Sequence, residues 1–243
     1  MLKPLPFQTQ YPTYLPKSLL YGSIAVSDIP RELHQILATS NGGYLQKNFC
    51  PTAEPTSDAL DGFYVPYLAG LRPKPATEAY LLPSLAHQNS FRYRPLLPQE
   101  SIILMEDKER VLFLDYQNNF RQPSVRYLDV ECDQWQEVAH SFASFWQALQ
   151  VGSPLDMVAG QASYQRFNAA FLAVTQAQEL QSLFNQVEAG FNKSWLFHWL
   201  GYFASALDIS QRNVAKEAFQ FQEDFFARSL PQNYPQVKAQ FAD

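Results

Sequence analysis

Residues 101–130 read SIILMEDKERVLFLDYQNNFRQPSVRYLDV, which is three apolar runs separated by two short polar segments. The runs at 101–105, 111–116 and 124–130 have the length and the aliphatic and aromatic content of β-strands. The charged segment 106–109 is too short to carry a parallel crossover, so it predicts an antiparallel hairpin between the first two strands. This stretch therefore predicts an antiparallel sheet.

Upstream of the sheet, residues 29–40 are expected to form one short helix. Ser27 and Asp28 supply N-cap chemistry, and Pro30 suits the first turn. The apolar side chains repeat with the helical period at Leu33, Ile36 and Leu37. Asn41-Gly42-Gly43 is expected to end the helix, because Asn and Gly tolerate the left-handed backbone.

The segments around this helix carry weaker signals. Residues 1–26 contain four prolines and are expected to form an extended arm. Residues 44–49 and 63–68 are predicted as strands, and Pro66 places the second of them at a sheet edge or a bulge. In the proline-rich segment 70–98, a short helix is expected at about 78–86.

After Asp133 the apolar and aromatic residues recur at steps of three and four, which predicts a helix that extends to about residue 149. They are Trp135, Val138, Phe142, Phe145, Trp146 and Leu149. Gly152-Ser153-Pro154 then marks a boundary, because Ser153 can cap a helix that begins at Pro154 and has Asp156 in its first turn. We therefore divide the chain into an α+β domain at 1–152 and an all-helical unit of about four helices at 153–243.

Composition excludes several classes of protein. The net charge is −5 without a run of Lys or Arg, so a phosphate backbone is a poor partner and nucleic acid is not expected. Cys50 and Cys132 form no CxxC and have no neighbouring His, so each is expected to be a small buried apolar residue rather than a zinc ligand or half of a disulfide. The longest apolar stretch, 195–207, is too short to span a membrane, and no signal peptide is recognisable. These features predict a cytoplasmic protein with no membrane segment.

Five pieces of sequence, taken in order, resemble the SUKH superfamily, in particular its branch similar to yeast cell-wall-synthesis regulators. They are Pro30-Arg31-Glu32-Leu33 with Leu37; Asn41-Gly42-Gly43; Val111-Leu112-Phe113-Leu114-Asp115-Tyr116; Pro123-Ser124-Val125 with Tyr127-Leu128-Asp129; and Val138-Ala139-Ser141-Phe142-Phe145. The resemblance covers about residues 15–150. The loop at 50–61, the insertion at 70–98 and the tail from 153 depart from the pattern of that family.

The resemblance implies an α+β domain in which helices flank a curved antiparallel sheet. It also implies a binding module rather than an enzyme, because many bacterial members of the superfamily look like immunity proteins against polymorphic toxins, and eukaryotic relatives look like regulatory scaffolds. It assigns no catalytic residue, no cofactor and no metal. Pro30, Asn41, Gly42 and Gly43 are expected to have structural roles.

The acidic residues of the predicted sheet are the main candidates for a site. Asp115 ends one strand, and Asp129, Glu131 and Asp133 alternate, so a strand that continued through them would place all three on one face. These carboxylates are compatible with three interpretations: a solvated sheet edge, a binding site for a hard cation, and an acidic patch that binds a basic protein. The third agrees with the resemblance.

Other candidate groups are few. Tyr64 and Tyr67 near the predicted edge strand are candidate interface anchors. Alternation places them on opposite faces unless Pro66 introduces a bulge, so at most one of them is expected to be available. His140 is three residues from Glu137, which on a helix would make a neighbouring pair, but the four histidines form no HExxH motif and no GxSxG is present. Asn41-Gly42-Gly43 follows a helix rather than opening one, so it does not form a phosphate loop.

Three functions are therefore compatible with the sequence. The first is a non-enzymatic module that binds and occludes a basic toxin domain. The second is a cytosolic regulatory scaffold whose helical tail supports docking or oligomerisation. The third, and the least favoured, is a metal-dependent hydrolase that uses Asp115, Asp129 and Glu131.

Overall fold

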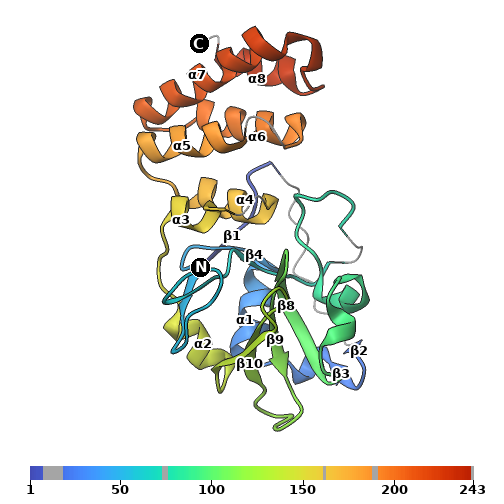
Figure 1. The fold of residues 1–243 in the computed structure, drawn as a ribbon. Coiled ribbons are helices and arrows are strands. Elements are labelled where there is room, and N and C mark those ends of the chain that lie inside the picture. The colour runs from blue at the N-terminus through green and yellow to red at the C-terminus, as the bar shows by residue number, and fades with distance from the viewer. Residues whose placement is uncertain (8–18, 73–75, 161–162, 188–190, 242–243) are drawn as a thin grey trace. The chain divides into compact units, whose positions relative to one another are not determined.

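The computed structural model describes residues 1–7, 19–72, 76–160, 163–187 and 191–241, and the chain forms two compact units (Figure 1). The first holds residues 1–5 and the described residues from Leu19 to Gly152. The second holds the described residues from Ser153 onward, together with Pro6 and Phe7 from near the N-terminus. Antiparallel sheets lie in the first unit and helices form the second, so the predicted α+β fold with a helical C-terminal region is confirmed.

A four-stranded antiparallel sheet is the largest sheet of the first unit. Its strands follow the order β11-β10-β9-β8, and β8, β9 and β10 are labelled in Figure 1. The bounds are Ser101–Asp107 for β8, Arg110–Asp115 for β9, Ser124–Asp129 for β10 and Gln134–Ala139 for β11. The three strands predicted within 101–130 are confirmed, and Lys108 takes a left-handed φ of 53° in the tight turn between β8 and β9.

The fourth strand corrects the sequence prediction. The helix expected from Trp135 onward begins only at Phe142: β11 precedes it, and α2 spans Phe142–Ala148, with the Ser141 hydroxyl accepting a hydrogen bond from the Ser144 N–H (3.2 Å). Trp135 lies opposite Leu128 of β10, and Gln136 lies opposite Tyr127. Spacings of three and four occur in the segment, but pairing with β10 satisfies its backbone and sets an alternating pattern of exposure instead.

The helix predicted upstream of the sheet is confirmed as α1, Arg31–Ser40, with Leu33 and Leu37 buried. Asn41 follows in the left-handed region at φ 43°, so the expected end of the helix is also confirmed. The start differs. Pro30 occupies the N-cap, whereas Ser27 and Asp28 belong to a separate short turn η1, Val26–Asp28, in which the Asp28 carboxylate accepts a hydrogen bond from the Ala25 N–H (2.7 Å).

Each of the strands predicted at 44–49 and 63–68 is divided between two small sheets. One sheet has the order β1-β4-β7, formed by Leu2–Lys3, Gly43–Leu45 and Tyr67–Leu68, and the other pairs β5, Phe49–Pro51, with β6, Gly62–Tyr64. A third pair joins β2, Leu19–Tyr21, to β3, Ile24–Ala25. Pro66 lies between β6 and β7 and has no N–H to continue a ladder, and β7 is an outer strand, as the proline indicates.

The helix predicted at 78–86 does not form. The described part of this segment contains two 3₁₀ turns, η2 at Leu85–Ser90 and η3 at Arg94–Leu96. Gln88 is buried in η2 and exchanges two hydrogen bonds with the backbone of Ile103 in β8, at 2.8 and 3.1 Å. The side-chain amide thus satisfies backbone groups at the outer edge of β8. Of the predicted arm at 1–26, residues 8–18 lie outside the described residues.

The second unit is built from helices. They are α3, Pro154–Val158; α4, Tyr164–Ala173; α5, Ala177–Val187; α6, Lys193–Ala204; α7, Ile209–Phe226; the short η4, Ala227–Ser229; and α8, Tyr234–Gln240. Ser153 caps α3 as expected, because its hydroxyl accepts a hydrogen bond from the Asp156 N–H (3.3 Å). The sequence did not predict α8, which begins after the Pro231 that ends the preceding pattern.

The two cysteines differ in solvent exposure. Cys50 is buried as expected, and burial raises the pKa of its thiol to about 12. Cys132 is exposed in the turn after β10, so the expectation that it is buried is wrong. Within the described ranges, no helix combines the length and the apolar character that crossing a membrane requires.

Candidate functional site

The acidic residues predicted as one patch lie in two places. Asp115 ends β9 opposite Ser124, and Asp129 lies at the other end of β10. The two ends of β10, Ser124 and Asp129, are five residue steps apart, which is about 17 Å. Asp115 is buried, pairs with the Arg126 guanidinium (Nη1 to Oδ2, 3.1 Å) and accepts the Gln117 N–H (3.0 Å). It therefore holds the connection after β9 and is not part of an exposed patch.

Asp129 is the centre of an ionic cluster with Arg110 and Asp58, whose three charged side chains are buried, and with the exposed residue Ser57. The Arg110 Nε atom lies 3.6 Å from an Asp58 carboxylate oxygen and 3.7 Å from one of Asp129, and its Nη2 donates to the Ser57 hydroxyl (3.0 Å). The Ser57 hydroxyl in turn donates to Asp129. Arg110 and Asp129 are strand residues, whereas Ser57 and Asp58 belong to the loop 52–61, so the cluster fixes that loop to the end of the sheet.

Glu131 and Asp133 lie in the turn from Val130 to Asp133, and both side chains are exposed. The expectation that they share a strand face with Asp129 is wrong, because the strand ends at Asp129. Its carboxylate turns back to accept the N–H groups of Glu131 (3.0 Å) and Cys132 (3.4 Å), an Asx turn that reverses the chain. Asp133 then takes a left-handed φ of 51°.

The Trp135 side chain packs beside this turn and is held in place by two contacts. Its indole N–H donates to the Asp133 carboxylate (3.0 Å), and its ring meets Phe113 edge to face, with centroids 6.2 Å apart. The Trp135 side chain remains 38% exposed. Helical spacing placed Trp135 in the core of a predicted helix, and the sequence QWQEVA of 134–139 does not alternate regularly enough to indicate a strand by itself.

The outer edge of β11 continues the same surface. Glu137 is exposed on this strand and lies opposite Arg126 of β10. Among the described residues, no backbone hydrogen bond joins β11 to a segment other than β10. We call Glu131, Asp133, Trp135 and Glu137 the acidic hairpin face. The turn 130–133 and β11 contain no Lys or Arg. The cation of the hairpin is Arg126 of β10, which lies opposite Glu137 and pairs with Asp115.

The two candidate anchor tyrosines are buried rather than exposed. Tyr67 is 1% exposed, and its hydroxyl both donates to the Glu106 carbonyl (2.7 Å) and accepts the Glu106 N–H (3.0 Å). Burial raises the pKa of the Tyr67 hydroxyl well above its usual range. Tyr64 is 6% exposed and packs against Phe49, with ring centroids 5.2 Å apart. Neither ring offers a surface to a partner.

The residues expected to have structural roles lie at the end of α1. Asn41 exchanges hydrogen bonds with the backbone of Leu71, accepting its N–H (2.6 Å) and donating to its carbonyl (3.0 Å). Gly42 has φ 85°, and a Cβ atom there would lie 2.5 Å from the Gly70 nitrogen. A residue with a side chain cannot occupy this position without moving the backbone.

The three acids of the hydrolase hypothesis are not brought together, because Asp115 is paired at the far end of the sheet and Asp129 is enclosed by Arg110. In the part of the chain that the structure describes, no group of three His, Cys, Asp or Glu side chains is placed to hold a metal ion. His140 follows β11 instead of sharing a helix with Glu137, and its Nε2 lies 3.2 Å from the Ser144 hydroxyl oxygen.

In comparisons with protein-family models, curated proteins and solved structures, no family, relative or structure matches this chain.

Proposed function

We propose that this chain is a non-enzymatic protein-binding module that uses the acidic hairpin face to bind a basic protein surface. The observation that carries the proposal is the exposure of Glu131 and Asp133 beside a partly exposed Trp135 whose position is fixed. Tryptophan supplies large contact area at protein interfaces, and carboxylates around it steer a basic partner and set its register.

The edge of β11 supports the same proposal. An edge strand whose outer backbone groups are unpaired can accept an additional strand from a partner, with affinity from the main chain and specificity from alternate side chains. Charged side chains on such an edge also disfavour self-association, because like charges of two copies would meet. A partner that presents Lys and Arg is attracted where a second copy is repelled.

The identity of the partner is proposed from the resemblance to the SUKH superfamily. That resemblance supports an immunity role, in which this cytoplasmic chain neutralises a basic toxin domain by occluding it. The alternative is a regulatory scaffold that binds a cellular protein through the same face. The neighbouring genes distinguish the two, because a toxin gene beside this one favours immunity.

The test is co-expression of the full chain with the toxin domain encoded beside it, together with calorimetric titration of the two proteins. The double variant E131K/D133K should abolish protection and weaken binding at least about tenfold, because two attractive charges become repulsive. The matched control is E217K/D224K on α7, which makes the same change in net charge at exposed positions of the helical unit.

Unchanged binding of E131K/D133K would remove the acidic hairpin face from the interface. Equal weakening by both double variants would show that only the total charge of the chain matters, which also contradicts the proposal.

A further inference from the structure

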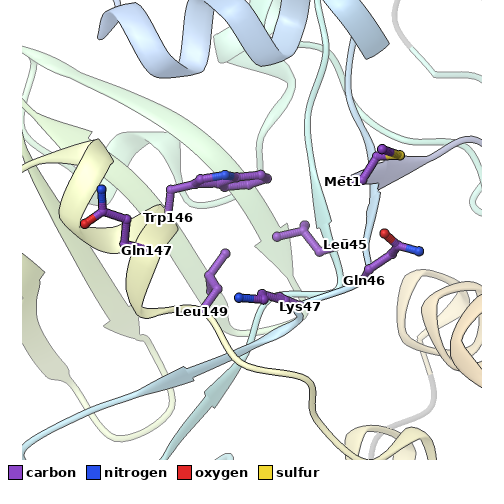
Figure 2. Close-up of a pocket in the computed structure, with 7 residues that line it drawn as sticks. All are labelled: Met1, Leu45, Gln46, Lys47, Trp146, Gln147 and Leu149. Carbon is purple, nitrogen blue, oxygen red and sulfur yellow. The ribbon is translucent and has the colours of Figure 1, made fainter.

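A pocket of about 360 Å³ lies in the first unit, and no residue of the acidic hairpin face lines it. It is formed between the end of α2 and the segment that leaves β4, with Met1 at its rim (Figure 2). Its volume falls within the range of small-molecule binding pockets, which is about 300–1,000 Å³.

The apolar walls of the pocket are held in place by the core. Leu45 and Leu149 are almost fully buried and form its base. Trp146 stacks on the buried ring of Phe142, with centroids 6.0 Å apart and planes inclined by 20°. In Figure 2 the indole of Trp146 extends toward Leu45, with Leu149 below it. The pocket therefore offers a flat aromatic surface that exists before a ligand arrives.

The charge of the pocket is positive. Lys47 is exposed and lines the pocket, and its side chain points toward Leu149 in Figure 2. Within the described residues Lys47 makes no ion pair. The other polar side chains that line the pocket are the uncharged amides of Gln46 and Gln147, so no carboxylate among its lining residues competes for this cation.

We propose that this pocket binds a small aromatic carboxylate. The ring of the ligand stacks on the Trp146 indole above Leu45 and Leu149, where offset stacking and apolar burial both favour it. Its carboxylate lies beside the Lys47 ammonium. A neutral aromatic molecule would gain only the stacking, and a small aliphatic acid would gain only the charge, so the pocket selects the combination.

The test is titration calorimetry of the full chain with 3-phenylpropionate, with the neutral amide 3-phenylpropanamide as the matched ligand. For a ligand of this size, we expect a dissociation constant of about 1 mM or tighter for the acid. The amide should bind about two- to fivefold more weakly, the ratio expected from one solvent-exposed charge pair.

Variants separate the two parts of the site. Lys47→Met should remove the preference for the acid and leave the amide unaffected, whereas Lys108→Met, an exposed lysine in the β8–β9 turn, should change neither. Trp146→Ala should weaken both ligands about tenfold or more, whereas Trp146→Phe, which retains a ring, should retain most of the binding.

Three outcomes would overturn the proposal. They are the absence of saturable binding of 3-phenylpropionate at concentrations up to about 10 mM, equal affinity for the acid and the amide, and undiminished preference for the acid in Lys47→Met. Thermal unfolding of each variant, compared with the unsubstituted chain, shows whether a loss of binding reflects a loss of folding.

Discussion

Gly70 has no room for a side chain, because a Cβ atom there would lie 1.8 Å from the Asn41 carbonyl oxygen. We expect Gly70→Ala to lower the free energy of unfolding by about 3 kcal/mol or more, since the turn after α1 must move away from β7. Gly22→Ala is the control. Gly22 has a left-handed φ of 55° but no atom nearer than 3.7 Å, so its cost should be only the backbone strain, about 1 kcal/mol.

Urea unfolding of the two variants measures the difference. A cost at Gly70 no larger than that at Gly22 would contradict the close approach of the two backbone segments.

His198 makes the stability of the helical unit depend on pH. Its ring is partly buried and stacks on Phe7, with centroids 4.7 Å apart, and burial lowers its pKa below the usual 6.5. Below that pH the unfolded chain takes up the proton more readily than the folded chain, so protonation favours unfolding. The stability contributed by neutral His198 is complete above pH 6.5 and is lost as the pH falls toward the folded pKa.

We therefore expect unsubstituted protein to lose stability relative to His198→Gln as the pH is lowered from about 7.5 to 5, because glutamine has no proton to gain. Urea midpoints of both proteins across this range measure the difference. A constant gap between the two midpoints would show that His198 does not titrate differently in the two states.

At the scale of elements, the loop 52–61 depends on Arg110 of β9. This side chain is the only cation in the described cluster with Asp58 and Asp129, and all three are buried. Arg110→Met should lower the free energy of unfolding by about 3–5 kcal/mol, because it leaves two buried carboxylates without a counter-charge. In this variant, amides of the loop should also exchange with solvent faster than they do in the unsubstituted protein, and this increase should exceed any increase in β9.

The control is Arg121→Met, which removes an exposed guanidinium from the loop between β9 and β10 and should cost less than about 0.5 kcal/mol. If Arg110→Met leaves hydrogen exchange of residues 52–61 unchanged, the ionic cluster does not hold the loop.

The elements also show where sequence periodicity was informative. The runs at 101–105, 111–116 and 124–130 became β8, β9 and β10, because each is bounded by turn residues and buried along most of its length. Residues 134–139 lack regular alternation, and the apolar spacing from Trp135 to Leu149 is helical. Pairing with β10 across the turn 130–133 made them a strand, so the packing of the hairpin overrode the local period.

At the scale of the whole molecule, each unit has a core of its own. In the helical unit, the buried Asn168 accepts the indole N–H groups of Trp195 (2.8 Å) and Trp199 (3.0 Å) on one oxygen. Asn168→Leu should destabilise this unit by about 2–4 kcal/mol, because two buried donors lose their acceptor. Hydrogen exchange of β8, β9 and β10 in the other unit should stay unchanged.

Asn213→Leu is the matched control, since Asn213 is exposed on α7 and the change should cost less than about 0.5 kcal/mol. Equal loss of protection in β8–β10 and in α6 of Asn168→Leu would show that the two units unfold together.

Local sequence determined the class of the fold, the three strands within 101–130, the helix that ends at Asn41 and the capped start of α3. Each depends on neighbouring residues, through periodicity, capping or turn chemistry, which a sequence displays directly. Tertiary structure decided the role of each acidic residue. Asp115 and Asp129 became buried partners of arginines, whereas Glu131 and Asp133 remained exposed, because the Asx turn at Asp129 ends the strand and Arg110 meets a loop some fifty residues away. Ion pairs and burial join residues that are distant in the chain, so they are set only once the sheet has assembled.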